Sequence, residues 1–578
     1  MTSHMTNEEV KSALHRGTDF LMQQQNSAGN FEGQLSSSTF PTCAYAWVLF
    51  AQDQSPDEAL IDWLIKHQNP DGTWGLDAAN QPNREATLFA QLILEQVWQQ
   101  QPNPQLAGVL ARIPPYPLNL ALIKLSYAAF GDFDWNKLTI PKRMLPVMTL
   151  AKKLLTKFPF LQSFLKPPTN VLPPVDLFHT RTFETLFIAE QHTLVPVFIL
   201  IELNTTRRPE MIASLVSWLI EHKLSDNSWF RVNYITALSV LALIELQKHI
   251  TGRQDTFNPE PTESAQSEEI QRLIDGGIAW LQSTRNPDGG CREALNLNIW
   301  DTALSVLTLI DIGNVDANNT IQRAGRWFID NQNPDGGWAF SAMGRTGSLL
   351  SDADDTALAT LSLLRAKIPS GAEAIQRGLD WLKAHQSPDG SCSTYLPGQG
   401  DVGCVSLTAH AIEAWCEATG MEVEIDRACR WLEGQISKEG YWSDLWLAKR
   451  TYGTACAIVG LIKAGKATSP AIARGVRWLE SVQNSDGGWG EDMFGNLTDS
   501  TVEQTGWCTY ALLLVDPESA AARKGLEFLL NRQRPEGSWD ASCVGIYWEI
   551  IGGYADPIYA VVFPLLALNQ YLKGTNGI

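Results

Sequence analysis

The stretch Gln332-Asn-Pro-Asp-Gly336-Gly-Trp338 decides the fold, because it recurs along the chain with a period of about 50 residues. Clear copies begin at Gln68, Gln483 and Gln533, and degenerate copies occupy residues 25–31, 223–229, 285–291, 386–392 and 435–442. A period in this range is typical of stacked or toroidal helical arrays. The sequence therefore predicts an all-α fold built from one repeated unit.

Each copy follows a segment that ends in an aromatic residue and an apolar neighbour, such as Trp327-Phe328 or Trp381-Leu382. Within the copy, Pro fixes φ for a turn, Asp bonds to its own backbone, and Gly supplies a left-handed position. The repeated unit is therefore a helix, a Pro-Asp-Gly turn and a second helix. We expect the Gln to cap a helix end and the Trp to pack over it, so that both residues tie one repeat to the next.

Size and composition fit a large helical enzyme of two domains, since 44% of the 578 residues are hydrophobic. The nine Cys are irregularly spaced, without a Cys-x-x-Cys pair or a signal-like N-terminus. This usage indicates reduced intracellular thiols rather than disulfides or a zinc site. The net charge of −19 at pH 7 argues against nucleic acid as a partner.

A second informative stretch, Asp352-Ala-Asp-Asp355, places three carboxylates at the start of an apolar segment. On a helix, Asp352 and Asp355 share a face, and crowded carboxylates cannot all ionise, so at least one pKa rises and one proton stays available. An acid that protonates a weakly basic C=C bond must be held protonated, dry and aimed. The alternative interpretation is an ordinary helix start, with Ser351 or Asp352 as the N-cap.

The segment 137–175 contrasts with the acidic chain, because it contains seven basic residues among apolar ones and no acid before Asp176. Lys and Pro interrupt it too often for a membrane span. Its pattern instead fits monotopic insertion into an anionic membrane interface. An ordinary basic pair of helices between domains is the alternative.

His410 lies one repeat after the Asp cluster, in Leu407-Thr-Ala-His410, and a lone helical His is usually structural. Its context is the set of Gln-x-x-x-Gly-x-Trp turns, the Asp-x-Asp-Asp-Thr-Ala sequence and segments such as Trp300-Asp-Thr-Ala303, Tyr452-Gly-Thr454 and Gly488–Asp492. Together these motifs make most of the chain resemble the squalene-hopene cyclases, which are class II terpene cyclases.

The resemblance implies two α/α-barrel domains around a large apolar cavity. Residues 1–20 and 270–578 would form the domain that carries the Asp cluster, and residues 21–269 would form the other, including the segment 137–175. By matching position, Asp354 is the expected proton donor and Asp352 and Asp355 support it. His410, as an imidazolium, would bind Asp354 and sharpen the acid.

The resemblance also implies aromatic faces that stabilise carbocations without offering a nucleophile. The substrate-binding candidates by position are Trp300, Phe340, Tyr395, Trp489 and Tyr559, with Trp548 near the C-terminal wall. Core packing is the alternative role for each of them.

No cofactor or metal is expected, with Mg²⁺ needed only if the substrate is a diphosphate. The expected partners are an apolar isoprenoid and a membrane interface contacted through residues 137–175, and the family often forms dimers. The expected location is cytoplasmic, on the inner face of the membrane.

The chain departs from the family at positions that choose substrate and product. Ser406, four residues before His410, stands where the family usually carries Asp, which leaves the histidine with a different orienting partner. Asp556 stands where an aromatic residue is expected. Thr42 or Ala44, and Phe89, fall where acidic residues help direct water in hopene-forming enzymes, and Val232-Asn233 replaces a Gln-Pro element.

Three functions follow, and they differ in testable ways. The first is polycyclisation of a linear isoprenoid, squalene or a similar polyprene, started by protonation. The second keeps this chemistry but uses a prenyl diphosphate or a prenylated aromatic acid, for which Arg231 is a candidate contact. The third is a non-catalytic α/α-toroid binding module or a subunit resembling the β-subunit of zinc prenyltransferases, for which no compact ligand motif stands out.

Overall fold

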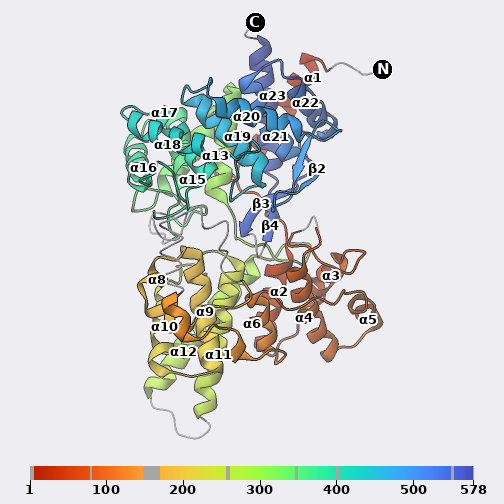
Figure 1. Ribbon diagram of the computed structural model, residues 1–578, viewed down its shortest axis with the longest axis vertical. Coiled ribbons are helices and arrows are strands. Elements are labelled where there is room, and N and C mark those ends of the chain that lie inside the picture. The colour runs from red at the N-terminus through yellow and green to blue at the C-terminus, as the bar shows by residue number, and fades with distance from the viewer. Residues whose placement is uncertain are drawn as a thin grey trace. The chain divides into compact units, whose positions relative to one another are not determined.

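The computed structural model describes residues 5–77, 81–147, 169–254, 261–344, 349–397, 402–548 and 552–576, and the protein is mostly helical (Figure 1). The chain forms two compact units. Unit 1 comprises Met1–Ser36 and Asn296–Ile578, and unit 2 comprises Ser37–Leu295. The sequence analysis had placed the two boundaries after residues 20 and 269.

The centre of unit 1 is a closed ring of six helices. Each contacts the next in chain order, and the last contacts the first. These inner helices are α13 (Asn298–Ile312), α15 (Ala353–Ala366), α17 (Val405–Cys416), α19 (Lys449–Lys463), α21 (Val502–Val515) and α23 (Tyr559–Asn576). Their residues are buried nearly all round, as expected for helices enclosed by other helices.

An outer layer of six helices covers this ring. It consists of α1 (Asn7–Gln23), α14 (Asn318–Asp330), α16 (Ala372–His385), α18 (Glu422–Gln435), α20 (Pro470–Ser481) and α22 (Ala520–Arg532). Each exposes one face and buries the other. The N-terminal α1 packs beside α22 and α23, so the two ends of the chain complete one α/α barrel (Figure 1).

The glutamines of the repeated turns join neighbouring outer helices. Gln332 Nε2 donates to Gly336 O in its own turn and to Ala374 O in the first turn of α16, both at 2.8 Å. Gln533 makes the same pair of bonds to Gly537 O and to Ala13 O of α1, at 3.2 and 2.8 Å. The turn glutamine thus donates a bond that joins its own turn to the next outer helix, including the junction that closes the barrel, but it does not cap that helix.

The tryptophan of each turn is fixed to the preceding outer helix. Trp338 Nε1 donates to Phe328 O at 2.9 Å, and the corresponding bonds of Trp442 and Trp539 are 2.7 and 2.8 Å. Gly336 has φ +98°, and a Cβ there would lie 3.0 Å from Arg377 O, so the turn needs glycine. In each aromatic–apolar pair, the backbone carbonyl of the second residue accepts this bond.

Unit 2 uses the same turns. Its inner helices contact one another in the order α6 (Ala121–Ala129), α4 (Arg84–Gln100), α2 (Thr39–Ala51), α11 (Asn233–Gln254) and α9 (Ile188–Asn204). They are covered by α5 (Pro104–Leu110), α3 (Glu58–Lys66), α12 (Pro261–Ser283) and α10 (Pro209–Glu221). The short α8 (Arg181–Glu184) and the 3₁₀ turns η1 (Trp135–Lys137), η2 (Lys142–Met144) and η4 (Val175–His179) connect them.

Unit 1 also contains a short 3₁₀ turn, η5 (Val315–Ala317), and two small antiparallel sheets that the sequence analysis did not predict. One pairs β1 (Trp489–Glu491) with β2 (Leu497–Thr501), and the other pairs β3 (Cys543–Trp548) with β4 (Gly552–Ala555). They lie between helices and lead into α21 and α23.

Candidate active site

The Asp cluster and His410 meet inside unit 1, at the N-terminal ends of neighbouring inner helices. Asp354 lies in the first turn of α15, and His410 lies in the second turn of α17. His410 Nδ1 and Asp354 Oδ1 are 2.5 Å apart, and the two residues are 7% and 8% exposed. The structure therefore brings together the two residues that the sequence analysis paired.

Asp352 and Asp355 form a second carboxyl pair beside this contact. Asp352 is the N-cap of α15 and accepts the Asp355 N–H at 2.9 Å, so the helix-start interpretation of the cluster also holds. Each carboxyl affects the pKa of the other. Asp352 Oδ2 and Asp355 Oδ1 are buried and find no N–H or O–H donor among the described residues.

Burial dominates the electrostatics of these carboxyls. It raises the pKa of Asp352 to about 7 and, with the charges of Asp352 and Asp354, raises the pKa of Asp355 well above its usual range. Burial also raises the pKa of Asp354, and the nearby His410 partly offsets this. Burial lowers the pKa of His410, but the Asp354 charge and hydrogen bond outweigh it and hold the pKa well above its usual value. These pKa shifts favour protonated carboxyls beside a His410 imidazolium.

Two of the predicted aromatic residues lie near this cluster. Trp300, in the first turn of α13, is 5% exposed, and its ring centroid is 5.9 Å from that of His410. Tyr559, the first residue of α23, is fully buried, and its hydroxyl is 3.3 Å from that of Tyr554. Burial, with the nearby Tyr554, Asp556 and Asp301, raises the pKa of Tyr559 well above its usual value.

Phe340 and Tyr395 lie in loops that contact the starts of α13 and α15. Phe340 is half-buried beside α13, where its carbonyl accepts the Ile299 N–H, and Tyr395 is buried in the loop whose Thr394 O accepts the Ala353 N–H. The Trp548 side chain is outside the described residues.

Trp489 occupies the turn position and bonds Leu479 O at 2.8 Å, as Trp338 bonds Phe328 O. A Cβ added at Gly525 would lie 3.0 Å from the Trp489 ring. A Cβ added at Gly378 would lie at the same distance from the Trp338 ring. The Trp489 ring is therefore packed between inner and outer helices, like those of the other turn tryptophans.

The sequence analysis did not select three aromatic residues that extend from His410 across the inner helices. The Tyr452 ring is 6.5 Å from His410 and 5.0 Å from Trp507. Trp507 is 5.1 Å from Phe563, which is 6.1 Å from Tyr559. Tyr452 stands in a segment that carried the resemblance, so the signal for it was present.

A further pair of buried acids lies at the starts of α13 and α23. Asp301 and Asp556 are each 0% exposed, and each affects the pKa of the other. Asp301 accepts the Gly33 N–H and Asp556 accepts the Ile558 N–H, both at 2.8 Å. Burial raises the pKa of Asp556 to about 6, and burial with the charge of Asp556 raises that of Asp301 well above its usual range.

The departures in unit 2 have local explanations. Thr42 accepts the Cys291 N–H at 2.9 Å, and Phe89 packs edge-on against Phe40, Trp47 and Tyr234. Arg231 is paired with Asp226 at 2.8 Å, so its charge is already matched.

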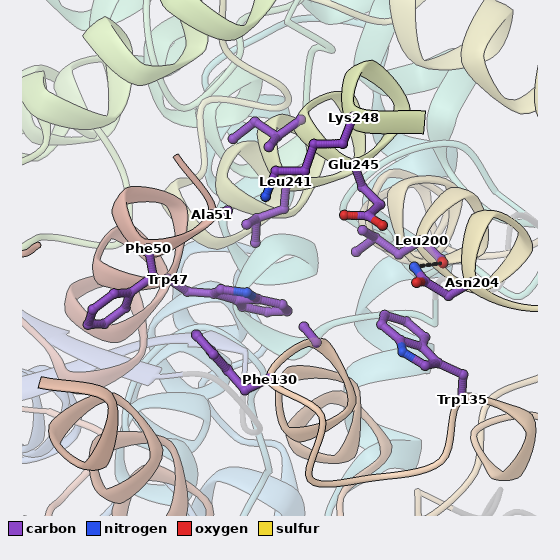
Figure 2. A pocket seen from close by; sticks show the side chains of 12 residues that line it. Trp47, Phe50, Ala51, Phe130, Trp135, Leu200, Asn204, Leu241, Glu245 and Lys248 are labelled. Atoms are coloured by element: carbon purple, nitrogen blue, oxygen red, sulfur yellow. Dashed lines mark hydrogen bonds between the residues drawn. The ribbon is translucent and has the colours of Figure 1, made fainter. Parts of the chain in front are cut away.

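A separate cavity of about 230 Å³ lies in unit 2 near the C-terminal ends of α2, α6 and α9. Figure 2 shows the rings of Trp47, Phe130 and Trp135 on one side and the side chains of Glu245 and Lys248 on the other. Its lining contains none of the predicted site residues. Its volume is also below the roughly 300–1,000 Å³ usual for ligand pockets.

Two further properties concern metals and membranes. Within the described ranges, no group of three or more His, Cys, Asp and Glu side chains is arranged to hold a metal ion. None of the helices in the described part of the chain has the length and hydropathy needed to cross a bilayer. Residues 148–168 of the predicted membrane segment lie outside the described residues.

Comparison with known proteins decides the family. The model of the squalene-hopene cyclase C-terminal domain matches residues 250–400 and 398–573, which is more than half of the chain. The chain belongs to the squalene-hopene cyclase family. The model of the prenyltransferase alpha-alpha toroid domain also matches residues 32–103 of this family member, of which all but the first five belong to unit 2.

Relatives of this family member cover nearly its whole length. The squalene-hopene cyclase of Alicyclobacillus acidocaldarius is 25% identical over 96% of this chain and 97% of its own. The dammaradiene synthase of Dryopteris crassirhizoma is 25% identical over 97% and 93%. The ent-copalyl diphosphate synthase of Streptomyces platensis shares the fold, with a TM-score of 0.58, 18% identity and coverage of 98% and 99%.

These findings confirm the predicted fold class and reaction class. The protein is a mostly helical α/α-barrel enzyme and a class II terpene cyclase, an intramolecular cyclase that acts as an isomerase. Class II squalene-hopene cyclases need no cofactor.

Proposed function

We propose that this squalene-hopene cyclase family member cyclises a linear isoprenoid, squalene or a similar long polyprene, by protonating a terminal C=C bond from Asp354. The observation that supports it best is the 2.5 Å contact between Asp354 Oδ1 and His410 Nδ1 in a buried site. In this proposal the imidazolium binds one oxygen of Asp354 while the other carries the proton. The bound cation makes the carboxyl a stronger acid than its burial alone would allow.

The proton passes from Asp354 to one alkene carbon, and the electrons of the next C=C bond attack the carbocation at the other. Each ring closure consumes one alkene and moves the positive charge along the chain. The resulting Asp354 carboxylate stays paired with His410, which limits its ability to trap the cation. Loss of a proton from the last cation, or addition of water followed by loss of a proton, ends the reaction and balances the proton that was donated.

Asp352 and Asp355 are proposed to support the donor. Because this pair retains a proton, it adds less negative charge beside Asp354 than two carboxylates would. Such a pair lets Asp354 be reprotonated after turnover without leaving three anions in a dry site.

Trp300, Tyr452, Trp507, Phe563 and Tyr559 are proposed to present ring faces to the moving charge. Each cation–π contact in a desolvated site contributes about 2 kcal/mol or more. Their contacts connect α13, α17, α19, α21 and α23, so an apolar chain that crosses the ring would meet one after another. Phe340 and Tyr395 are proposed to border the same side as Trp300.

A membrane interface is the proposed source of so apolar a substrate. Support comes from the described start of segment 137–175, where Met144 and Val147 are 41% and 55% exposed beside Lys142 and Arg143. Apolar side chains flanked by bases suit the surface of an anionic leaflet. Peripheral binding at the cytoplasmic face, without a spanning helix, is the arrangement we propose, and a homodimer is compatible with it.

The substrate is tested by incubating the detergent-solubilised enzyme with squalene, prenyl diphosphates and prenylated aromatic acids, with and without EDTA. Extracts are analysed by gas chromatography–mass spectrometry. Cyclised squalene that is insensitive to EDTA is the expected result. Cyclisation of a diphosphate that EDTA abolishes would replace squalene and bring in Mg²⁺, and no cyclised product from any compound would contradict the proposal.

A further inference from the structure

The N-terminal end of α17, the helix that carries His410, is held by a carboxylate from another segment. Asp444 Oδ2 accepts the Ser406 N–H at 2.9 Å and the Cys404 thiol at 3.3 Å, and Asp444 Oδ1 accepts the Trp446 N–H at 3.0 Å. Cys404 is the N-cap of α17 but makes no side-chain capping bond. Asp444, which is 1% exposed, therefore supplies the cap.

The position of Asp444 at the N-terminal end of α17 affects the charge of His410. Ser406 and His410 are four residues apart, so they lie one turn apart on the same face of α17. A cation in the first turns of a helix is disfavoured by the positive end of the helix dipole. A buried carboxylate at this end offsets that effect, and it does so in a region where little water screens the interaction.

This arrangement accounts for the departure at position 406. The family usually carries Asp there, one turn before the histidine, whereas this chain has a fully buried Ser406. Asp444 brings a carboxylate to the backbone N–H of that same residue. The acid has been relocated from α17 to the segment that precedes α19.

The backbone that carries the Asp444 side chain is itself fixed by close contacts. Its own N–H donates to Lys449 O at 2.8 Å, and a Cβ at Gly453 would lie 3.1 Å from that N atom. Trp442, two residues earlier, is fixed by its turn bond to Leu432 O. After burial and the opposing effects of His410, the charge of Asp444 is a further cause that raises the pKa of Asp354.

We infer that Asp444 is a positioning residue for the acid: it fixes α17 so that His410 Nδ1 stays on Asp354, and its charge stabilises the His410 imidazolium. The inference rests on the proposed function of Asp354 as proton donor. It assigns to this chain a relocated partner for the histidine, held by bonds to Ser406 and Cys404.

Asp444→Asn separates this role from simple helix capping, because Asn caps a helix about as well as Asp but carries no charge. We expect kcat to fall about tenfold to 100-fold, as when a carboxylate that orients a histidine is lost, with KM within about twofold. In the double variant Ser406→Asp with Asp444→Asn, a carboxylate returns one turn before His410. This variant should recover most of the lost kcat.

Glu491→Gln is the matched control. Glu491 is 2% exposed and caps α19 through the N–H groups of Lys449, Arg450 and Thr451, so it is an equally buried capping carboxylate on the neighbouring helix. It should lower Tm without a comparable loss of kcat. Equal effects of Glu491→Gln and Asp444→Asn on kcat would overturn the inference.

A second measurement needs no substrate. In protein labelled with ¹⁵N-histidine, the His410 signals are assigned from their absence in His410→Gln. They should show an imidazolium at pH 7 in the parent, a larger neutral fraction in Asp444→Asn, and an imidazolium again in the double variant. An unchanged His410 spectrum in folded Asp444→Asn would overturn the inference. If the parent cyclises no compound, the proposed function fails while this spectrum still decides the role of Asp444.

Discussion

The starts of the inner helices differ between the two units, although the turns that build them are the same. In unit 1, buried acids lie at the starts of three inner helices. They are Asp301 at α13, Asp352, Asp354 and Asp355 at α15, and Asp556 at α23. In unit 2, α4 is capped by the neutral Asn83, and α2 follows Ser38. Burying so many carboxyls destabilises a protein, so the acids of unit 1 indicate chemistry in addition to helix capping.

Unit 2 sharpens the contrast because it also contains one buried acid without a basic partner. Glu293 is 1% exposed, and neither Oε atom has a donor of good hydrogen-bond geometry among the described residues. Burial raises the pKa of Glu293 to about 8, with only partial compensation by the Tyr234 N–H. Unlike Asp354, Glu293 has no hydrogen bond to a histidine in the described part of the chain that would make its proton easier to donate.

The largest expected effect comes from Asp354→Asn. The variant keeps the shape of the side chain but has no acidic proton, so turnover should fall by about 10³-fold or more. Product formation by chromatography measures this, and Tm should change by only a few degrees. The matched Glu293→Gln removes an equally buried acid from unit 2, and its turnover should stay within about threefold of the parent. Normal turnover in Asp354→Asn would refute the proposed donor.

A second pair of variants separates two kinds of buried tryptophan. Trp300→Phe replaces the best cation–π partner by a weaker one and should lower kcat about tenfold, with a small change in Tm. Trp338→Phe loses the bond to Phe328 O, which then accepts only the Asn331 N–H, and this costs about 0.5–1.5 kcal/mol of unfolding free energy. Its kcat at low temperature should be close to that of the parent. If both variants lost activity and stability in parallel, this division of the tryptophans would be wrong.

The difference between turn tryptophans and substrate-facing tryptophans could be predicted only in part from the sequence. The turn chemistry of Gln332 and Trp338 is local, so periodicity and residue type sufficed to predict a structural role. Trp489 carries the same turn pattern, and the structure gives it the same bond. Its selection as a substrate-binding candidate came from matching position, and its place in the repeat was a signal against that choice.

Contacts between segments that are far apart in the chain could not be predicted from the sequence. Asp444 and Ser406 are 38 residues apart, and the bond between Gly33 and Asp301 joins residues 268 apart. Only the closed helical ring brings such residues together. The Asp cluster was readable because its acids are adjacent, and both interpretations of it hold, since Asp352 caps α15 while Asp354 contacts His410.

Glu293 also gives a prediction about pH and stability. Its folded pKa of about 8 lies above the unfolded value near 4.5, so its contribution is complete below pH 4.5 and is lost as pH rises toward 8. Between pH 5 and pH 8 this loss is about 3 kcal/mol. Glu293→Gln should therefore be more stable than the parent at pH 8, with the difference shrinking toward pH 5. Denaturant unfolding at both pH values measures it, and a difference independent of pH would contradict the assignment.

The smallest effect tests what the two units share. Gln332→Ala removes two buried bonds, to Gly336 O and Ala374 O, and only Ala374 O keeps a partner within its helix, so unfolding free energy should fall by about 1–3 kcal/mol. Gln24→Ala, which loses one long exposed bond to Phe20 O, is the control and should stay within about 0.5 kcal/mol. Because Gln68 makes the corresponding bonds to Gly72 O and Val109 O, Gln68→Ala should behave like Gln332→Ala. A loss of stability in one unit alone would mean that the turns do not stabilise the two units equally. Unit 1 would then differ from unit 2 in more than its acids.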